Sequence, residues 1–205
     1  MSEYDHEPVR GLPEALPADE TILWQGSPDW KQLAAHALHI RLAALYFGGI
    51  ALWAIARGDV NTAIGVGTLG LIVFGMQLLF AWGVGRTTVY TLTSKRIVMR
   101  IGVALNKCIN LPLGEIETAD LKMLGLGHGN IVLHLKGMPR MGYIMLWPHV
   151  RSLRIVRPAP MLRAIPEAQM VGQTLFKAAQ QIQPVAVRAV EPQRAPERPM
   201  QGAAA

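Results

Sequence analysis

The sequence predicts an α+β protein: a hairpin of two transmembrane helices, followed by a small antiparallel β domain that ends in a C-terminal helix. Three observations lead to this prediction. Only 17% of the 205 residues are charged, against roughly 25% in soluble globular proteins. A run of 26 residues between Asp59 and Arg86 carries no charge. After this run, short β-prone segments follow one another, and a segment with helical periodicity comes last.

The long uncharged run is the stronger candidate span, which we place at residues 62–85. As a helix the whole run would extend about 39 Å, more than the ~30 Å hydrocarbon core of a bilayer. The first span is placed at residues 38–57. Its uncharged stretch Leu42–Ala56 is short, but Arg41 and Arg57 can reach the headgroups from inside the hydrocarbon boundary. A re-entrant or interfacial helix is the alternative for this segment.

The segment Arg57–Asn61 joins the two spans and contains Gly, Asp and Asn, which favour a turn. Both ends of the hairpin therefore lie on one side of the membrane. Basic residues flank these ends, whereas the connecting loop has one arginine offset by one aspartate. The positive-inside rule then predicts that both termini and the β domain are cytoplasmic. The acidic first thirty residues also show no basic, apolar leader.

Charge divides the chain into four segments. Residues 1–30 form an acidic N-terminal segment with a net charge of −6, and the predicted hairpin occupies residues 31–85. The predicted β domain covers residues 86–182, and the Pro- and Arg-containing residues 183–205 are predicted to be disordered. A basic body fits a domain near anionic lipid, although a solvated basic face is the alternative. The bases are dispersed and no nucleic-acid-binding motif is present, so we expect no nucleic-acid partner.

The β domain is predicted from strand candidates at intervals of roughly 8–12 residues, which is typical of a small antiparallel sheet or barrel. These candidates are residues 89–93, 96–101, 106–113, 115–124, 131–136 and 142–147. The segment Gly125–Gly129 lies between two of them and lacks a following Lys-Ser or Lys-Thr, so we interpret it as a turn rather than a phosphate loop. Residues Pro166–Ile182 are predicted to form a helix whose apolar stripe covers the sheet: Ala168, Val171, Leu175, Ala178 and Ile182.

The sequence contains no constellation typical of an enzyme. There is no Gly-x-Ser-x-Gly, His-Glu-x-x-His, Cys-x-x-Cys or Walker motif. The acidic residues Glu115, Glu117 and Asp120 have no accompanying nucleophile, so a solvated strand face is the simpler interpretation. We therefore expect no catalytic residue, no metal site and no resident cofactor. His36 and His39, spaced i, i+3 on one helix face, could contact headgroups, a metal or a tetrapyrrole magnesium, or have no ligand.

Small residues suggest how the membrane helices pack. Ala44 and Gly48 are four residues apart on the first helix, and Ala63 and Gly67 are four apart on the second. Such pairs allow helix backbones to approach closely in lipid. They could face each other, a second copy of the chain in a homodimer, or another membrane protein.

Two segments resemble the bacterial PH-domain membrane proteins. One is Glu20–Trp30, which contains a Trp-x-Gly-x-Pro element ahead of the hairpin. The other is Tyr90–Gly102, which contains a Tyr-x-Leu-Thr-x-x-Arg pattern like the first hairpin of their β domain. Within that group, Glu3–Pro13 and Leu146–Arg151 resemble the photosynthetic complex assembly proteins of purple bacteria.

This resemblance implies an inner-membrane protein with a PH-like domain that helps to assemble the photosynthetic reaction centre and is not an enzyme. The implied partners are reaction-centre subunits and membrane lipid, and a transient contact with bacteriochlorophyll stays open. Binding of anionic lipid headgroups is the alternative function. Tryptophan is enriched among the energetically dominant residues of interfaces, and arginines can bind acidic surfaces. The candidate partner-binding residues are Trp24, Trp30, Trp147, His149, Arg151 and Arg154.

Overall fold

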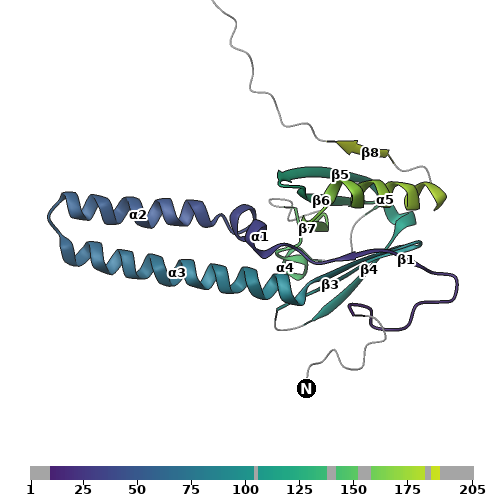
Figure 1. Cartoon of the computed structure of the whole chain (residues 1–205), viewed down its shortest axis with the longest axis horizontal. Coiled ribbons are helices and arrows are strands. Elements are labelled where there is room, and N and C mark those ends of the chain that lie inside the picture. Colours follow the sequence, from purple (N-terminus) through teal and green to yellow (C-terminus); the bar gives the residue numbers. More distant parts are fainter. Residues whose placement is uncertain (1–9, 104–105, 138–141, 152–157, 183–185, 190–205) are drawn as a thin grey trace, which may run out of the picture.

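The structure is a computed structural model of the chain, and it describes residues 10–103, 106–137, 142–151, 158–182 and 186–189. A long helical hairpin projects from one end of a β-rich domain (Figure 1). The hairpin consists of α2 (Ile40–Ala56) and α3 (Val60–Thr87), and the short helix α1 (Trp30–His36) precedes it. The predicted α+β class, with apolar helices ahead of antiparallel sheets and a C-terminal helix, is confirmed.

Helix α3 is long and apolar enough to cross a membrane, and its most apolar 18-residue stretch is 0% buried by the rest of the structure. This helix matches the span predicted at residues 62–85. The helix predicted at about residues 38–57 corresponds to α2, which begins two residues later, at Ile40. His39 adopts a left-handed backbone conformation (φ 53°) and separates α1 from α2, which meet at an angle of 56°. The chain thus has one or two candidate membrane spans, which associate it with a membrane.

The hairpin turn is set by local hydrogen bonds. The Asp59 side chain accepts a hydrogen bond from the backbone N–H of Thr62 at 3.0 Å and so caps the N-terminus of α3. Gly58 supplies the positive φ of 77° that the turn requires. Further along, α3 and α2 pack closely, because a Cβ added at Gly70 would lie only 2.8 Å from Cβ of Phe47.

The β domain contains two four-stranded sheets among the described residues. The first has the order β1-β2-β3-β4: β1 (Ile22–Gly26), β2 (Val89–Thr93), β3 (Arg96–Ile101) and β4 (Lys107–Pro112). The second has the order β7-β6-β5-β8: β5 (Ile116–Gly125), β6 (His128–Leu135), β7 (Met161–Ile165) and β8 (Ala186–Ala189). Neighbouring strands are antiparallel except for β8, which runs parallel to β5.

One apolar core unites the two sheets with the C-terminal helix α5 (Ala168–Ile182). It contains Tyr90 and Met99 from the first sheet, Ile131 and Leu133 from the second, and Leu175 from α5. The predicted stripe of α5 is buried along its length except for its last residue. Burial of this stripe explains why an otherwise weakly apolar segment is a stable helix.

Four elements differ from the sequence-based expectation. The acidic N-terminal segment contributes strand β1, which pairs with β2 and so belongs to the β domain. The strand predicted at residues 142–147 is instead the short helix α4 (Tyr143–Leu146). Strand β7 was not predicted. Strand β8 lies within the tail that was predicted to be disordered, and the rest of that tail lies outside the described residues.

Candidate functional site

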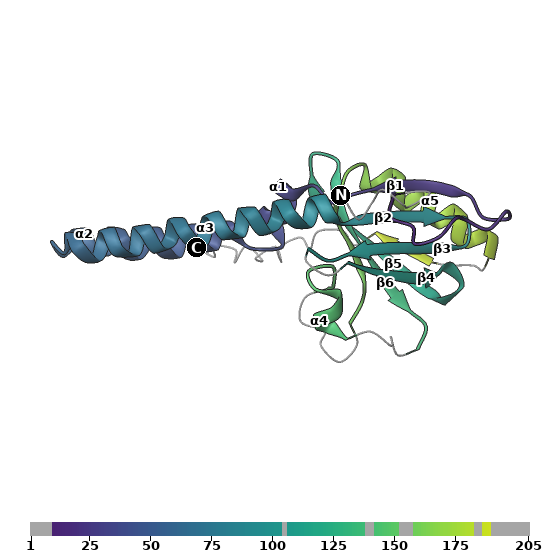
Figure 2. The ribbon, with the colours of Figure 1, turned by 90° about the horizontal axis from the view of Figure 1, so that it is seen from below.

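The hairpin and the β domain meet at a packed junction (Figure 2). Helix α3 ends at Thr87 and strand β2 begins at Val89, so a single residue, Thr88, separates the candidate membrane span from the first sheet. Helix α1 packs beside this point, and its residue Trp30 approaches α3 so closely that a Cβ on Gly85 would lie 3.0 Å from Cβ of Trp30. A displacement of α3 must therefore move the first sheet.

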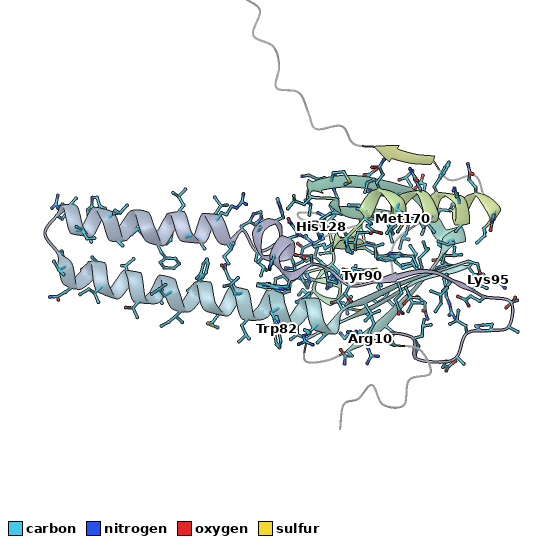
Figure 3. The ribbon with its side chains drawn as sticks, in the orientation of Figure 1. Arg10, Trp82, Tyr90, Lys95, His128 and Met170 are labelled. Carbon is cyan, nitrogen blue, oxygen red and sulfur yellow. The ribbon has the colours of Figure 1, made fainter. Side chains whose placement is uncertain are left out.

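A chain of buried polar groups crosses the junction. The hydroxyl of Tyr90 lies 2.5 Å from Nδ1 of His149, and Oγ1 of Thr88 lies 3.3 Å from Nε2 of the same ring. All three residues are at most 1% exposed. Strand β2 supplies Tyr90, and the segment after α4 supplies His149. Figure 3 places Tyr90 inside the domain near the end of α3.

The hydrogen-bond partners fix the protonation of this chain. The backbone N–H of Arg163 donates to the Tyr90 hydroxyl oxygen at 3.3 Å, which leaves the Tyr90 O–H free to donate to Nδ1 of His149. A neutral imidazole then carries its proton on Nε2 and donates it to Thr88. Burial, with a smaller contribution from the Arg163 charge, lowers the pKa of His149 to about 3. Burial also raises the pKa of Tyr90 well above its usual value, so both groups are neutral near pH 7.

Arg163 is a buried charged residue at the junction. Its Nη2 donates to the carbonyl oxygen of Val150 at 2.9 Å, and burial lowers the pKa of its guanidinium. Its Nε has no hydrogen-bond partner among the described residues. A buried arginine beside an imidazole disfavours a second positive charge, which explains the electrostatic part of the lowered His149 pKa.

Helix α4 completes the junction from the other side. The ring of Trp147, just after α4, stacks on Phe80 of α3 with centroids 5.2 Å apart and planes inclined by 28°. The Trp147–Pro148 peptide bond is cis. Leu146, at the end of α4, is fully buried in the main core. The segment Leu146–Arg151 therefore connects the membrane hairpin, the first sheet and the second sheet.

This arrangement couples the hairpin to the β domain through buried contacts. The imidazole and phenol of the junction are enclosed and hydrogen-bonded to each other, so neither presents a reactive atom to solvent. In the part of the chain that the structure describes, no group of three or more His, Cys, Asp or Glu side chains could hold a metal ion. The geometry makes the hairpin and the β domain one mechanical unit.

The predicted partner-binding tryptophans occupy three different environments. Trp24 is half-buried on β1 and packs against the main core, and its ring covers Gly26. Trp30 is half-buried at the start of α1, in contact with α3. Trp147 is 50% exposed beside Phe80. Of the three, Trp147 presents the largest exposed fraction.

The expectation for His149 needs correction, because a side chain that is 1% exposed cannot reach a partner at the surface. Arg151 is partly exposed and lies 3.5 Å from the carboxylate of Asp120, which also lies 3.0 Å from Nε2 of His134. This carboxylate partly neutralises Arg151. Arg154 lies outside the described residues. The structure thus places Trp147 and His149 at the junction, pairs Arg151 with Asp120 of β5, and packs Trp24 against the main core.

The small residues of the hairpin separate into two groups. Ala63 is buried between the helices, whereas Ala44 and Gly48 are exposed. A Cβ added at Gly48 or Gly67 would meet no atom within 4 Å. The close contact inside the hairpin is made instead by Gly70 with Phe47. Ala44 and Gly48 therefore do not close the hairpin, and their surface is available to another helix.

The predicted pairing of two histidines before the first span is also corrected. His36 ends α1 and His39 occupies the break before α2. Because His39 has a left-handed backbone, the i, i+3 relation of a continuous helix does not apply. Both imidazoles are exposed.

Three residues that make contacts at the junction have no distinctive sequence signal: Thr88, Phe80 and Arg163. Tyr90 appeared only as part of a family pattern. The partners of Tyr90 lie 59 and 73 positions further along the chain, and no local spacing connects residues so far apart.

Comparison with known proteins identifies the family. Residues 33–179 match the family described as Bacterial PH domain. A relative from Rhodobacter capsulatus, described as "Uncharacterized 23.7 kDa protein in puhA 5'region", is 38% identical over 188 residues. The aligned part covers 87% of this chain and 88% of that protein. No solved structure matches the chain. The chain belongs to the bacterial PH domain family, and its match includes both hairpin helices as well as most of the β domain.

Proposed function

We propose that this protein is a membrane-bound assembly factor for the photosynthetic reaction centre, of the kind represented by the assembly protein PuhB of purple bacteria. The observation that carries the proposal is the 38% identity, over nearly the whole of both chains, to the Rhodobacter capsulatus protein whose description refers to puhA. The resemblance of Glu3–Pro13 and Leu146–Arg151 to photosynthetic complex assembly proteins supports the same assignment. The protein acts by binding and not by catalysis.

The hairpin supplies a surface for a client helix. Among the described residues, Ala44 and Gly48 lie on an exposed face of α2, and a Cβ added at Gly48 would meet no atom within 4 Å. Small residues allow a neighbouring helix to approach closely in lipid, where dispersion and backbone contacts drive association. A contact of this kind is weak and reversible, as a factor that releases its client requires. The client helices are those of incomplete reaction-centre subunits.

The β domain supplies a second contact on the cytoplasmic side. The junction through Tyr90, His149 and the Trp147–Phe80 stack fixes this domain relative to the hairpin. A client held at both places is bound by two linked contacts. Once one contact has formed, the second forms at a high effective concentration, so the combined affinity exceeds that of either contact alone. Both chain termini lie on the cytoplasmic side in this orientation, because the basic residues flank the same ends of the hairpin.

A deletion experiment tests this function. The gene for the relative is deleted in Rhodobacter capsulatus, and the strain is complemented with a tagged copy of this chain. We expect reaction-centre absorbance to fall in the deletion strain and to recover with the wild-type chain. Unchanged reaction-centre accumulation after deletion would rule out the proposal.

Two variants connect the phenotype to the proposed surface. The substitution Gly48→Leu adds bulk on the exposed face of α2, and we expect it to reduce both complementation and recovery of reaction-centre subunits in mild-detergent pull-downs. Leu71→Phe, on an exposed part of α3, is the matched control and should retain both. Equal behaviour of the two variants would mean that this helix face does not bind the client.

A further inference from the structure

Two large aliphatic side chains are exposed at the end of the domain that faces the hairpin. Leu126, in the turn between β5 and β6, is 89% exposed, and Ile144 of α4 is 90% exposed. Exposure of such large apolar side chains to water is unfavourable. Further exposed apolar residues accompany them at the same end: Val103, Met145 and Trp147.

The position of α4 along the hairpin follows from its contact with α3. Trp147, next to α4, stacks on Phe80. Phe80 comes twenty residues after Val60, the first residue of α3, which is about 30 Å of helix and equals the thickness of a hydrocarbon core. If Val60 lies at one boundary of the core, Phe80 and α4 lie at the other. Trp82 and Arg86 follow at the headgroup level, where such residues are enriched.

The β5–β6 turn lies at the same level on the other side of the hairpin. Leu124, just before the turn, packs against a cluster that contains Ala81 and Val84 of α3, and Phe80 packs against the same cluster. His128, just after the turn, lies 3.8 Å from Asp29, the N-cap residue of α1. Figure 3 places His128 at the hairpin end of the domain, and Figure 2 shows α4 at that end too.

The backbone of the turn holds Leu126 outward. Gly125, Leu126 and Gly127 have φ values of 107°, 52° and 76°. A left-handed conformation is favourable for glycine but strains the backbone of a leucine. The backbone at position 126 is therefore strained, because glycine or asparagine would be favoured there and the residue is instead an exposed leucine. Strain of this kind indicates that the leucine side chain has a role other than stabilising the fold.

We propose that the β5–β6 turn and α4 insert Leu126 and Ile144 into the interface of the same bilayer that the hairpin spans. The two insertions flank α3 and fix the domain against the membrane surface. Exposed basic side chains at this end of the molecule match the anionic headgroups that surround such an insertion: Lys31, Arg41, Arg86 and Lys122. The proposal rests on the membrane-spanning hairpin of the proposed function, but not on any reaction-centre client.

The test uses the full-length chain in liposomes that contain anionic lipid. Cys108 is replaced by serine, and single cysteines are introduced as Leu126→Cys or Ile144→Cys and labelled with an environment-sensitive fluorophore. Lipids with a quencher near the headgroup report insertion. Ala18→Cys, at an exposed position beside Asp19 and far from the hairpin, is the negative control. Leu71→Cys, exposed on α3, is the positive control for a deeply inserted helix.

We expect blue-shifted emission and loss of most fluorescence to the shallow quencher at positions 126 and 144. Ala18→Cys should lose almost none, and Leu71→Cys should respond to a quencher deep in the acyl chains. Quenching at position 71 without quenching at 126 and 144 would overturn the insertion while leaving the membrane hairpin intact. No quenching at position 71 would remove the membrane span and the insertion together.

A second measurement requires no fluorescent label. Hydrogen exchange of Tyr143–Leu146 is compared between the wild-type chain and a Leu126→Asp/Ile144→Asp double variant, both in lipid nanodiscs. Insertion predicts slow exchange in the wild type and faster exchange in the variant. Equal exchange in the two proteins would contradict the insertion. If protection appears only after a reaction-centre subunit is added, the surface binds protein and not lipid, which also overturns it.

Discussion

The hydroxyl of Tyr90 donates a hydrogen bond of 2.5 Å to Nδ1 of His149, and both residues are buried where the membrane hairpin enters the β domain. The contact joins strand β2, which continues α3, to the segment that follows α4. Since Nδ1 of His149 accepts this bond only when it carries no proton, the junction depends on a neutral imidazole. Through this hydrogen bond, the pH of the solution affects how firmly the hairpin is attached to the β domain.

The first prediction concerns pH. The pKa of His149 is about 3 in the folded protein, against 6.5 for the ordinary imidazole. Below pH 6.5 the unfolded state binds a proton that the folded state does not, so stability falls as the pH decreases from about 6.5 towards 3. At pH 5 this loss amounts to about 2 kcal/mol, from 1.5 pH units at about 1.4 kcal/mol each. Thermal unfolding of the full chain in micelles between pH 7.5 and 5 measures it.

The substitution His149→Asn is the control for this prediction. Asparagine offers an acceptor near the position of Nδ1 but does not titrate. The variant should be less stable at pH 7.5, because ring packing is lost, and should show a much smaller change between pH 7.5 and 5. An unchanged pH dependence would show that another group is responsible.

The second prediction concerns the attachment of β1. Glu20, just before β1, accepts hydrogen bonds from Nε and Nη2 of Arg96 at 2.9 and 3.0 Å, and from the hydroxyl of Thr93 at 2.6 Å. Burial raises the pKa of Glu20, but the hydrogen bonds from Arg96 and Thr93 outweigh it, so the pKa is lowered overall. Replacing Glu20 with Gln should reduce the free energy of unfolding by about 1–3 kcal/mol. Denaturant titration measures the change.

The neighbouring ion pair between Asp19 and Lys95 serves as the comparison. Both of its side chains are largely exposed, and exposed ion pairs are screened by water. Asp19→Asn should therefore have little effect in the same titration. Equal destabilisation by the two substitutions would mean that charge alone, and not buried hydrogen bonding, holds β1 in place.

The third prediction concerns packing within the hairpin. A Cβ at Gly70 would lie 2.8 Å from Cβ of Phe47, whereas a Cβ at Gly48 would meet nothing within 4 Å. Overpacking of a close contact costs about 1–3 kcal/mol, so Gly70→Ala should lower the resistance of the hairpin to unfolding in SDS. Gly48→Ala should leave it unchanged or slightly higher. A larger loss for Gly48→Ala would contradict the packing.

The fourth prediction concerns the contact between α4 and α3. Replacing Trp147 with Ala removes its stack on Phe80, an aromatic pair worth about 1 kcal/mol beyond area burial. We expect faster hydrogen exchange of Tyr143–Leu146 in this variant and little change in β3, which lies away from the contact. Trp147→Phe keeps an aromatic ring and should retain most of the protection. Exchange that rises equally in both variants would mean that stacking does not hold α4.

The strand and helix pattern was predictable where local signals are strong. Strands β2 and β3 and helices α3 and α5 carry clear apolar runs or periodicities, and the structure confirms them. The segment at residues 142–147 was misassigned because a short apolar run fits a strand or a helix equally well. Strand β7 has Arg163 at its centre, which interrupts the apolar pattern of a buried strand, and in the structure this arginine is buried and donates to the carbonyl oxygen of Val150.

The candidate site was predictable in part. Trp147 and His149 were both predicted as partner-binding residues from the Trp-Pro-His-Val-Arg element, but the sequence did not distinguish their burial. The exposed residue is the tryptophan, and the histidine is enclosed. The difference arises because burial depends on which distant strands cover a segment, and no residue near His149 in the sequence reports the position of Tyr90.

By itself, the sequence determined the apolar span at α3, the α+β class with apolar helices ahead of the strands and a helix near the C-terminus, and the family, because hydrophobic periodicity and turn residues act over a few neighbouring positions. Only the tertiary structure decided that β1 joins the first sheet, that His39 interrupts the first apolar helix, and that His149 is neutral beneath Tyr90. These properties depend on pairing, burial and electrostatic environment, which are set by residues dozens of positions apart and are formed only when the chain is folded.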